Sequence, residues 1–108
     1  MIKNINHTRG DTLAFGFTYD EPTQDLDTCY FTIKEHPEDE TILVQKKLND
    51  GITKVDTGSY RVRVAPEDTK NLNLGTYYYD LEVGINSDVY TLLKGKLELT
   101  YDVTRSDD

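Results

Sequence analysis

Residues 75–83 read Gly-Thr-Tyr-Tyr-Tyr-Asp-Leu-Glu-Val, and this stretch decides the fold class. One set of alternate positions is apolar or aromatic: Tyr77, Tyr79, Leu81 and Val83. The other set is mostly polar: Thr76, Tyr78, Asp80 and Glu82. Successive side chains of a β-strand point to opposite faces of the sheet, so a period of two predicts a strand with one buried face and one solvated face. Such strands are typical of antiparallel sheets that cover a core on one side.

The same alternation recurs in four other segments, which are 11–19, 28–35, 58–65 and 88–103. In the last of these, one parity holds the apolar residues Val89, Leu93, Leu97, Leu99, Tyr101 and Val103. Two segments are less regular. We expect 2–7 to form an edge strand with Ile5 inward. We expect 41–48 to form a strand with a bulge or an edge position, because Lys46 falls at an inward parity.

Turn residues such as Asn49-Asp50-Gly51 separate these segments, and only 66–72 is typical of a helical turn, with Pro66 at its first position. About seven short strands with one helical turn near 66–72 predict an all-β, immunoglobulin-like antiparallel β-sandwich. A β-barrel with a similar number of strands is the alternative. The 108 residues suffice for one domain, which we place at 1–104, followed by a polar tail at 105–108.

Gly75 and Tyr77 are candidates for a structural role at the start of the strand 75–85. A tyrosine two residues after a glycine, just beyond a helical turn, is where a tyrosine corner of an immunoglobulin-like sandwich would lie. Tyr77 would then place its ring in the core and its hydroxyl on the preceding turn. The alternative is an ordinary inward-facing tyrosine.

The charge balance restricts the partners. Twenty acidic and 12 basic residues give a net charge of −8 and a pI near 4.6. Binding to a phosphate backbone or to anionic lipid needs a positive field, so we expect neither nucleic acid nor a membrane as a direct partner. Residues 1–12 lack the apolar core of a signal peptide, so we expect no export by that route.

We expect no enzyme activity and no cofactor, because no catalytic motif is apparent. Cys29 is the one cysteine, and it shares the inward parity of Phe31 and Ile33, which predicts an inert core thiol. His7 and His36 lie in different segments, and neither has a partner spacing for a metal site or a catalytic triad. We expect both histidines at the surface.

Carboxylates gather in two polar segments. Asp20, Glu21, Asp25 and Asp27 lie in one loop, whose oxygen atoms could hold Ca²⁺, although the spacing matches no EF-hand. The alternative is a solvated loop without an ion. Glu38-Asp39-Glu40 presents the same choice with fewer carboxylates.

Outward-facing residues of three strands predict a protein interface. In an immunoglobulin-like sandwich the third, sixth and seventh strands lie side by side. Their outward residues would include Tyr30, Tyr78, Tyr90 and Leu92. Tyrosine is enriched at the centres of protein interfaces. The alternative is ordinary cross-strand packing on a solvated face. Edge pairing through 2–7 or 41–48 would be a rival route to assembly.

Several motifs follow one another in a recognisable order: Gly10-Asp11-Thr12, Cys29-Tyr30-Phe31-Thr32-Ile33-Lys34, Gly58-Ser59-Tyr60, Pro66-Glu67-Asp68-Thr69 and the stretch 75–83. In this order the chain resembles small phage and prophage structural proteins of Gram-positive hosts. It is also similar to the immunoglobulin-like N-terminal domain of phage baseplate upper proteins, which continue into a longer C-terminal region. The resemblance spans about residues 9–103. It implies a virion or tail-associated structural module with no catalytic residues.

We therefore expect a non-enzymatic structural or accessory protein of a phage or phage-like particle, in its tail, baseplate, neck or capsid surface. It would act through protein–protein contacts with other virion proteins or with copies of itself. It would be made in the host cytoplasm and reside in the particle. Two alternatives stay open: a host-surface module that binds carbohydrate or protein, and a small acidic inhibitor of a host nucleic-acid-binding protein.

Overall fold

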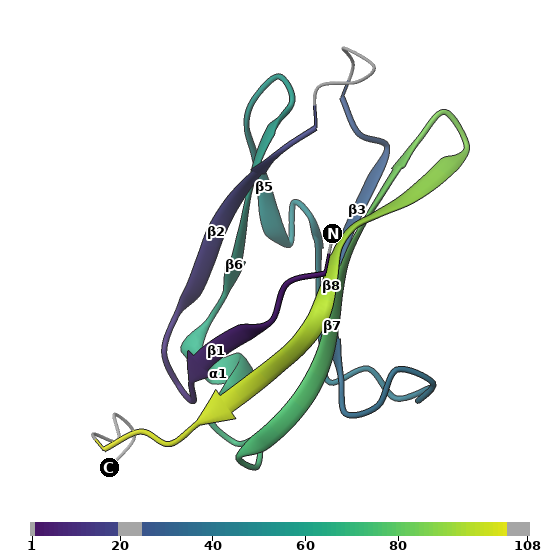
Figure 1. Ribbon diagram of the computed structural model, residues 1–108. Coiled ribbons are helices and arrows are strands. Elements are labelled where there is room, and N and C mark those ends of the chain that lie inside the picture. Colours follow the sequence, from purple (N-terminus) through teal and green to yellow (C-terminus); the bar gives the residue numbers. More distant parts are fainter. Residues whose placement is uncertain (1, 20–24, 104–108) are drawn as a thin grey trace.

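A computed structural model describes residues 2–19 and 25–103. This part of the chain contains eight strands and one short helix (Figure 1). In chain order they are β1 (Ile5–Thr8), β2 (Leu13–Thr18), β3 (Thr28–Lys34), β4 (Val44–Leu48), β5 (Gly51–Asp56), β6 (Ser59–Val64), α1 (Pro66–Thr69), β7 (Gly75–Ile85) and β8 (Asp88–Thr100). The described residues include no helix with the length and apolarity that a membrane crossing requires.

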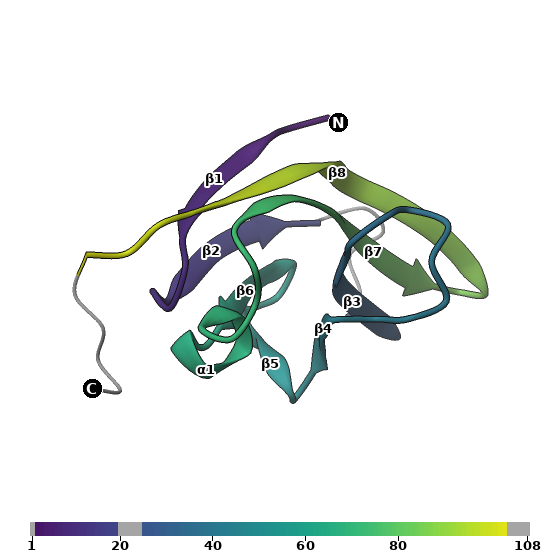
Figure 2. The same cartoon turned by 90° about the horizontal axis from the view of Figure 1, so that it is seen from below.

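The strands form one hydrogen-bonded series in the order β1-β8-β7-β3-β4-β5-β6-β2, and the series folds over itself into two layers (Figure 2). One layer holds β1, β8, β7 and β3, and the other holds β5, β6 and β2. β4 carries the series between them, because it pairs antiparallel with β3 and parallel with β5. The two-layer, all-β architecture predicted from the alternation is therefore confirmed.

The core lies between the layers and is made of the inward parity of the strands. The side chains of Phe31, Ile33, Leu81 and Val62 have no exposed surface. Each such side chain contributes about 1.5–3 kcal/mol by leaving water. The predicted inward sets of β3, β6 and β7 are confirmed, and Cys29 is 1% exposed beside them.

The predictions for 41–48 were wrong in one respect and incomplete in another. The strand begins at Val44. It is not an edge strand, because it pairs with β3 on one side and with β5 on the other. β5 was not predicted. Of its six residues only Ile52 is buried, and one buried residue leaves no period-two signal.

Lys46 does face inward in β4, and an ion pair explains how. Its side chain is 17% exposed, and its Nζ lies 2.9 Å from Oδ2 of Asp68 in α1. The aliphatic stem passes over Gly51, where a Cβ would overlap it. Gly51 has a φ of +97°, which also favours glycine. The inward lysine is therefore a neutralised contact between β4 and α1 and does not require a bulge.

β1 corrects the prediction for His7. Ile5 is only half-buried, whereas His7 is 7% exposed, so the histidine fills the inward position of this strand. Its Nε2 lies 3.0 Å from the carbonyl oxygen of Asp11. Sequence alternation identifies inward positions by their apolar residues, so it misses a buried histidine. Burial of the His7 ring is possible because the ring has a hydrogen-bond partner.

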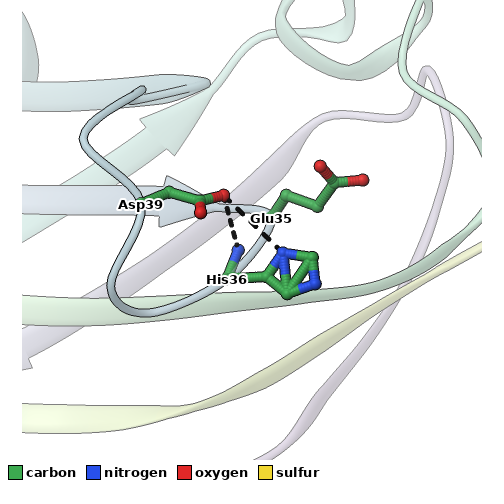
Figure 3. A group of neighbouring side chains, drawn as sticks. All are labelled: Glu35, His36 and Asp39. Atoms are coloured by element: carbon green, nitrogen blue, oxygen red, sulfur yellow. Dashed lines mark hydrogen bonds and ion pairs between the residues drawn. The ribbon is translucent and has the colours of Figure 1, made fainter.

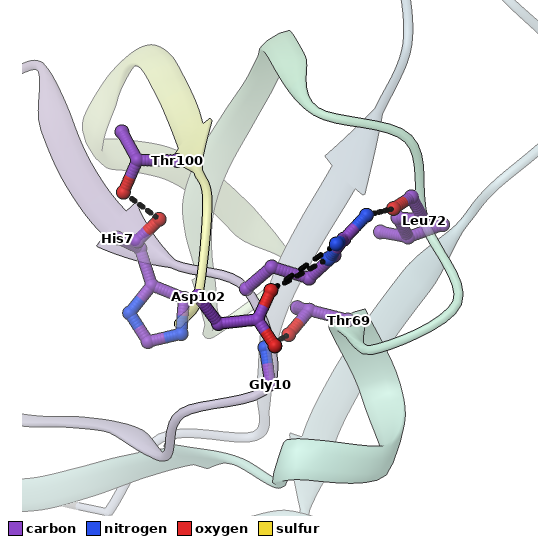
Figure 4. Close-up of polar contacts among 7 residues, drawn as sticks. His7, Gly10, Thr69, Leu72, Thr100 and Asp102 are labelled. Carbon is purple, nitrogen blue, oxygen red and sulfur yellow. Dashed lines mark hydrogen bonds and ion pairs between the residues drawn. The ribbon is translucent and has the colours of Figure 1, made fainter. Parts of the chain in front are cut away.

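A polar cluster ties the corner between β1 and β2 to the end of β8 and to α1 (Figure 4). Arg9 pairs with Asp102 at 3.1 Å, with side chains 20% and 12% exposed. The Nη1 of Arg9 donates to the carbonyl of Leu72 at 3.3 Å, and the amide of Gly10 donates to Oγ1 of Thr69 at 2.9 Å. These contacts fix the lower end of both layers.

Tyr77 lies at the start of β7 with its ring buried. Its hydroxyl donates to the carbonyl of Asn73 at 2.6 Å, in the turn that follows α1, which is the geometry of a tyrosine corner. Gly75, which lies between Asn73 and Tyr77, has a φ of +141°, a backbone conformation that residues with a side chain rarely adopt. α1 itself is shorter than the predicted 66–72. The predicted tail at 105–108 lies outside the described residues.

Candidate functional site

The outer face of β4, β3, β7 and β8 gathers the candidate binding residues. Paired residues of neighbouring strands point to the same face. Tyr78 lies between Lys34 and Lys96, and Asp80 lies between Thr32 and Lys94. Along the same face, Glu82 pairs with Tyr30 of β3 and with Thr91 of β8. Tyr30 and Tyr78 therefore share the outer face, as predicted.

Tyr90 and Leu92 do not share this face, and a β-bulge is the reason. Leu81 pairs with Leu93, but Glu82 pairs with Thr91, so Leu92 is an extra residue in β8. An extra residue reverses the side-chain parity on the N-terminal side of the bulge. Leu92 is half-buried and packs against the core.

Tyr90 lies on the core side of β8, at the margin of the sandwich. It pairs with Val83, which is fully buried, and its ring centroid is 6.3 Å from that of Tyr19 beyond β2. Val89, which was expected inward, is 62% exposed. The predicted outward set of four residues is thus reduced to Tyr30 and Tyr78.

A groove of about 480 Å³ crosses this outer face. Tyr78 and Lys94 form part of its floor. Ile2, next to β8, and Pro37, in the loop after β3, are among the residues that line its two ends. A second hollow of about 320 Å³ continues it toward β4 and includes Tyr30 and Ile42. The two hollows share Thr32, Lys34 and Asp80, so they form one concave surface, which we call the outer groove.

The N-terminal segment borders the outer groove through Ile2 and Asn4, and contacts on the core side of β8 hold this segment in place. The amide of Lys3 donates to the carbonyl of Lys94 at 2.9 Å, and the Tyr79 hydroxyl donates to the carbonyl of Lys3 at 2.6 Å. A Cβ on Gly95 would overlap that carbonyl oxygen. Asn4 then accepts a hydrogen bond from the amide of Lys96 at 3.1 Å through its side chain.

The electrostatics of the outer groove differ from those of the whole chain. Its face combines the carboxylates of Asp80, Glu82 and Glu98 with four lysines, Lys34, Lys47, Lys94 and Lys96. Partial burial raises the pKa of Asp80, and Lys34 and Lys94 on either side oppose that rise. A chain of net charge −8 therefore presents a face where the two signs nearly balance.

The described residues offer little for covalent chemistry at this face. Burial raises the pKa of the Cys29 thiol to about 12, so the thiolate nucleophile is not formed near neutral pH. His7 is buried on the core side of β1, where it pairs with the buried Leu99 of β8. What the outer groove supplies is aromatic surface and paired charges, which bind a partner by shape and polarity.

One group that could hold a cation lies in the loop after β3 (Figure 3). One ligand atom from each of Glu35, His36 and Asp39 lies within 4.8 Å of the others. Asp39 Oδ2 already accepts a hydrogen bond from the amide of His36 at 3.2 Å and lies 3.7 Å from its Nδ1. The sequence prediction named Asp39 together with Glu38 and Glu40 in this loop, and it missed Glu35 and His36 as the neighbours of Asp39. Side chains so exposed are common without an ion, so we assign no metal here.

The predicted calcium loop is only partly described. Asp20 and Glu21 lie outside the described residues. The Asp25 carboxylate pairs with Lys54 at 2.8 Å, and Asp27 accepts a hydrogen bond from the amide of Asn86 at 3.0 Å. The two described carboxylates thus contact different parts of the chain, Asp25 the strand β5 and Asp27 the turn between β7 and β8.

No protein-family model matches the sequence, and no curated protein sequence matches it. Among solved structures the chain is similar to the immunoglobulin-like domain of mouse leukocyte-associated immunoglobulin-like receptor 1, crystallised as a strand-swapped dimer. The identity is 10%, the coverage is 90% of this chain and 88% of that chain, and the TM-score is 0.55. This likeness confirms the immunoglobulin-like fold.

A second similar structure is the extracellular domain of the voltage-gated sodium channel β4 subunit, whose parallel homodimers are said to explain its role in cell–cell adhesion. Its identity is 14%, it covers 94% of this chain and 93% of that chain, and its TM-score is 0.47. The likeness to the receptor domain and the geometry above define the protein as an immunoglobulin-like β-sandwich with a concave outer face that carries Tyr30 and Tyr78.

Proposed function

We propose that the protein is a non-enzymatic binding module that acts through protein–protein contacts made by the outer groove. The observation that carries the proposal is the concave face itself, which places Tyr30 and Tyr78 among nearly balanced charges. Binding energy at protein interfaces is concentrated in a few residues, and tyrosine contributes large contact area with little side-chain entropy to lose. Exposed apolar residues on both rims, Ile2 and Ile42, extend the contact.

We further propose that the module belongs to a phage or phage-like particle and that its partner is another virion protein. The support for this step is the order of motifs along residues 9–103, which resembles phage structural proteins. A face with balanced charges suits a protein partner better than a polyanion. The immunoglobulin-like fold hosts many functions, so it does not by itself favour one over another.

The experiment has two stages. Mass spectrometry of purified particles first identifies whether the chain is a stoichiometric component. Individually purified virion proteins are then titrated against the chain by isothermal calorimetry. Tyr30→Ala combined with Tyr78→Ala should weaken the complex by about 100-fold, because each truncated hot-spot residue costs on the order of 1–2 kcal/mol.

Tyr101→Ala is the matched control, because Tyr101 is 71% exposed and lies outside the outer groove. It should leave the affinity unchanged. A chain that is absent from particles would overturn the particle assignment. Equal affinities of the double variant and the control for a bound partner would overturn the assignment of the outer groove.

A further inference from the structure

The open edge of β2 is a second surface of the molecule, on the layer opposite the outer groove. Among the strands of residues 2–19 and 25–103, β2 is the last of the series and pairs only with β6, and β1 lies at the other end. Its residues Leu-Ala-Phe-Gly-Phe-Thr contain no charge and no proline, and their register with β6 is continuous. Charges, prolines and bulges usually prevent an edge strand from pairing with another chain. β2 has none of these features, so its edge is open to a further strand.

The direction of the backbone groups can be derived from one hydrogen bond. The amide of Tyr19 donates to the carbonyl of Gly58 at 2.7 Å, continuing the ladder between β2 and β6. Antiparallel ladders alternate, so the odd-numbered residues of β2 face β6 with their amides and carbonyls. The amides and carbonyls of Ala14, Gly16 and Thr18 therefore point to the open edge.

Two arginines flank this edge on the outer face of β6. Arg61 pairs with Gly16, and Arg63 pairs with Ala14. Both arginines are exposed, and neither has an ion pair or a side-chain hydrogen bond to the described residues. Because their neighbours on β2 are so small, the guanidinium groups can extend across β2 toward whatever lies beyond it.

The inner side of the same edge is apolar. Leu13, Phe15 and Phe17 face the core but are only half-buried, unlike the fully buried inward residues of β6. Strand spacing is about 4.8 Å, so an added strand would cover their exposed flanks. The edge thus offers backbone groups, an apolar inner side and two cations on its outer side.

We propose that the edge of β2 binds an extended acidic segment of a partner protein, which adds to the sheet as a further strand. Main-chain hydrogen bonds to Ala14, Gly16 and Thr18 would hold the segment. Arg61 and Arg63 would bind carboxylates at alternate positions of its outer face, in the manner of β-augmentation with side-chain selectivity.

The charges decide against a second copy of this chain as the occupant. Two β2 edges joined about a two-fold axis would place Arg61 and Arg63 of both copies on one continuous face, with no acidic residue in either β2 to compensate them. The net charge of −8 also repels an acidic segment, but charges beyond about 8 Å are screened at physiological salt, so the two nearby arginines dominate.

Because the two arginines are positive and the whole chain is negative, peptides of opposite charge distinguish binding at this edge from attraction by the overall charge. The probes are two fluorescein-labelled ten-residue peptides, one of alternating valine and glutamate and one of alternating valine and lysine. The overall charge of the protein favours the lysine peptide, whereas the arginine pair favours the glutamate peptide. Fluorescence anisotropy should show the glutamate peptide binding about tenfold more tightly, with a preference that falls as salt is added.

Three variants locate the binding. Arg61→Glu with Arg63→Glu should reverse the preference, whereas Lys94→Glu with Lys96→Glu, a matched change in the outer groove, should keep it. Gly16→Pro removes one open-edge amide without touching the β6 ladder, and it should abolish binding of the glutamate peptide. Circular dichroism melts check that each variant is folded.

Amide shifts in NMR complete the test. The glutamate peptide should shift Ala14, Gly16 and Thr18 and spare β7. The proposal is overturned if neither peptide binds, if the lysine peptide binds as tightly, or if the shifts fall on the outer groove. Failure of this proposal would leave the proposed role of the outer groove standing, because the two surfaces lie on different layers.

Discussion

The two layers of the sandwich present different kinds of surface, although both obey the same alternation. The layer of β3, β7 and β8 has long strands and an outer face with a groove, which Ile2 and Asn4 of the N-terminal segment and Pro37 of the loop after β3 help to line. The layer of β5, β6 and β2 has short strands, small residues on its last strand and an unpaired edge. The first layer offers side chains to a partner, and the second offers main-chain groups.

The comparison teaches that a glycine within a strand can serve opposite purposes. Gly95 in β8 makes room on the core side of the sheet for the backbone of Lys3, whose neighbours Ile2 and Asn4 line the outer groove. Gly16 in β2 leaves open space beside Arg61. In both cases the absent Cβ shapes a surface, but only Gly95 is needed for packing.

The largest expected effect separates these two glycines. Gly95→Ala forces the Lys3 backbone to move and should lower the free energy of unfolding by about 3 kcal/mol, the upper end of the range for overpacking. At Gly16 a Cβ would meet its nearest atom, the carbonyl oxygen of Tyr60, at an ordinary 3.5 Å. Gly16→Ala should therefore change stability by less than about 0.5 kcal/mol. Urea unfolding of the two variants measures both values, and equal effects would contradict the difference between the layers.

A smaller effect distinguishes two of the buried tyrosines, Tyr60 and Tyr77. The hydroxyl of Tyr60 in β6 accepts a hydrogen bond from the buried amide of Leu26 at 3.0 Å. Tyr60→Phe leaves that donor unsatisfied and should cost about 2 kcal/mol. Tyr77→Phe instead frees the carbonyl of Asn73, an exposed residue that water can reach, and should cost about 1 kcal/mol.

Thermal unfolding of the two phenylalanine variants tests this order. If Tyr77→Phe has the melting temperature of the parent protein, the hydroxyl of the tyrosine corner contributes nothing to stability. If Tyr77→Phe is the more damaging change, the turn before β7 depends on the corner more than the described contacts imply.

The smallest effect concerns Asp80 in the outer groove. Burial raises its pKa in the folded state, so the folded protein holds this proton more tightly than the unfolded chain does. The contribution of Asp80 to stability therefore falls as pH rises from its unfolded value, about 3.9, through its folded pKa. Asp80→Asn should match the parent at low pH and become relatively more stable near neutral pH. A variant that loses stability only near neutral pH would show that Lys34 and Lys94 outweigh burial.

The sequence predicted the elements whose two faces differ most. β3, β6 and β7 alternate cleanly because every inward residue is apolar and buried, so their position and parity followed from the pattern alone. β5 was missed because Ile52 is its one buried residue. In β8 the extra residue Leu92 follows no turn signal and is itself apolar, so the reversed parity of Tyr90 could not be read from the sequence.

Of the outer groove, the sequence predicted only residues of the floor. Tyr30 and Tyr78 followed from the alternation, but the walls of the outer groove are made by contacts between distant segments, such as Tyr79 with Lys3. A usable signal was Gly95, because a glycine within a strand often marks the close approach of another backbone. His7 shows the reverse case, in which a hydrogen bond lets a polar residue take an inward position.

Lysine footprinting of the chain in purified particles tests most directly whether the outer groove is the surface that binds the partner. Lys94 and Lys96 are exposed beside Tyr78 in the free protein, and Lys54 is exposed on the other layer. Acetylation followed by mass spectrometry should show Lys94 and Lys96 protected by about tenfold in the particle, with Lys54 as reactive as in the free chain. Protection of Lys54 alone, or no protection of Lys94 and Lys96, would contradict binding through this face.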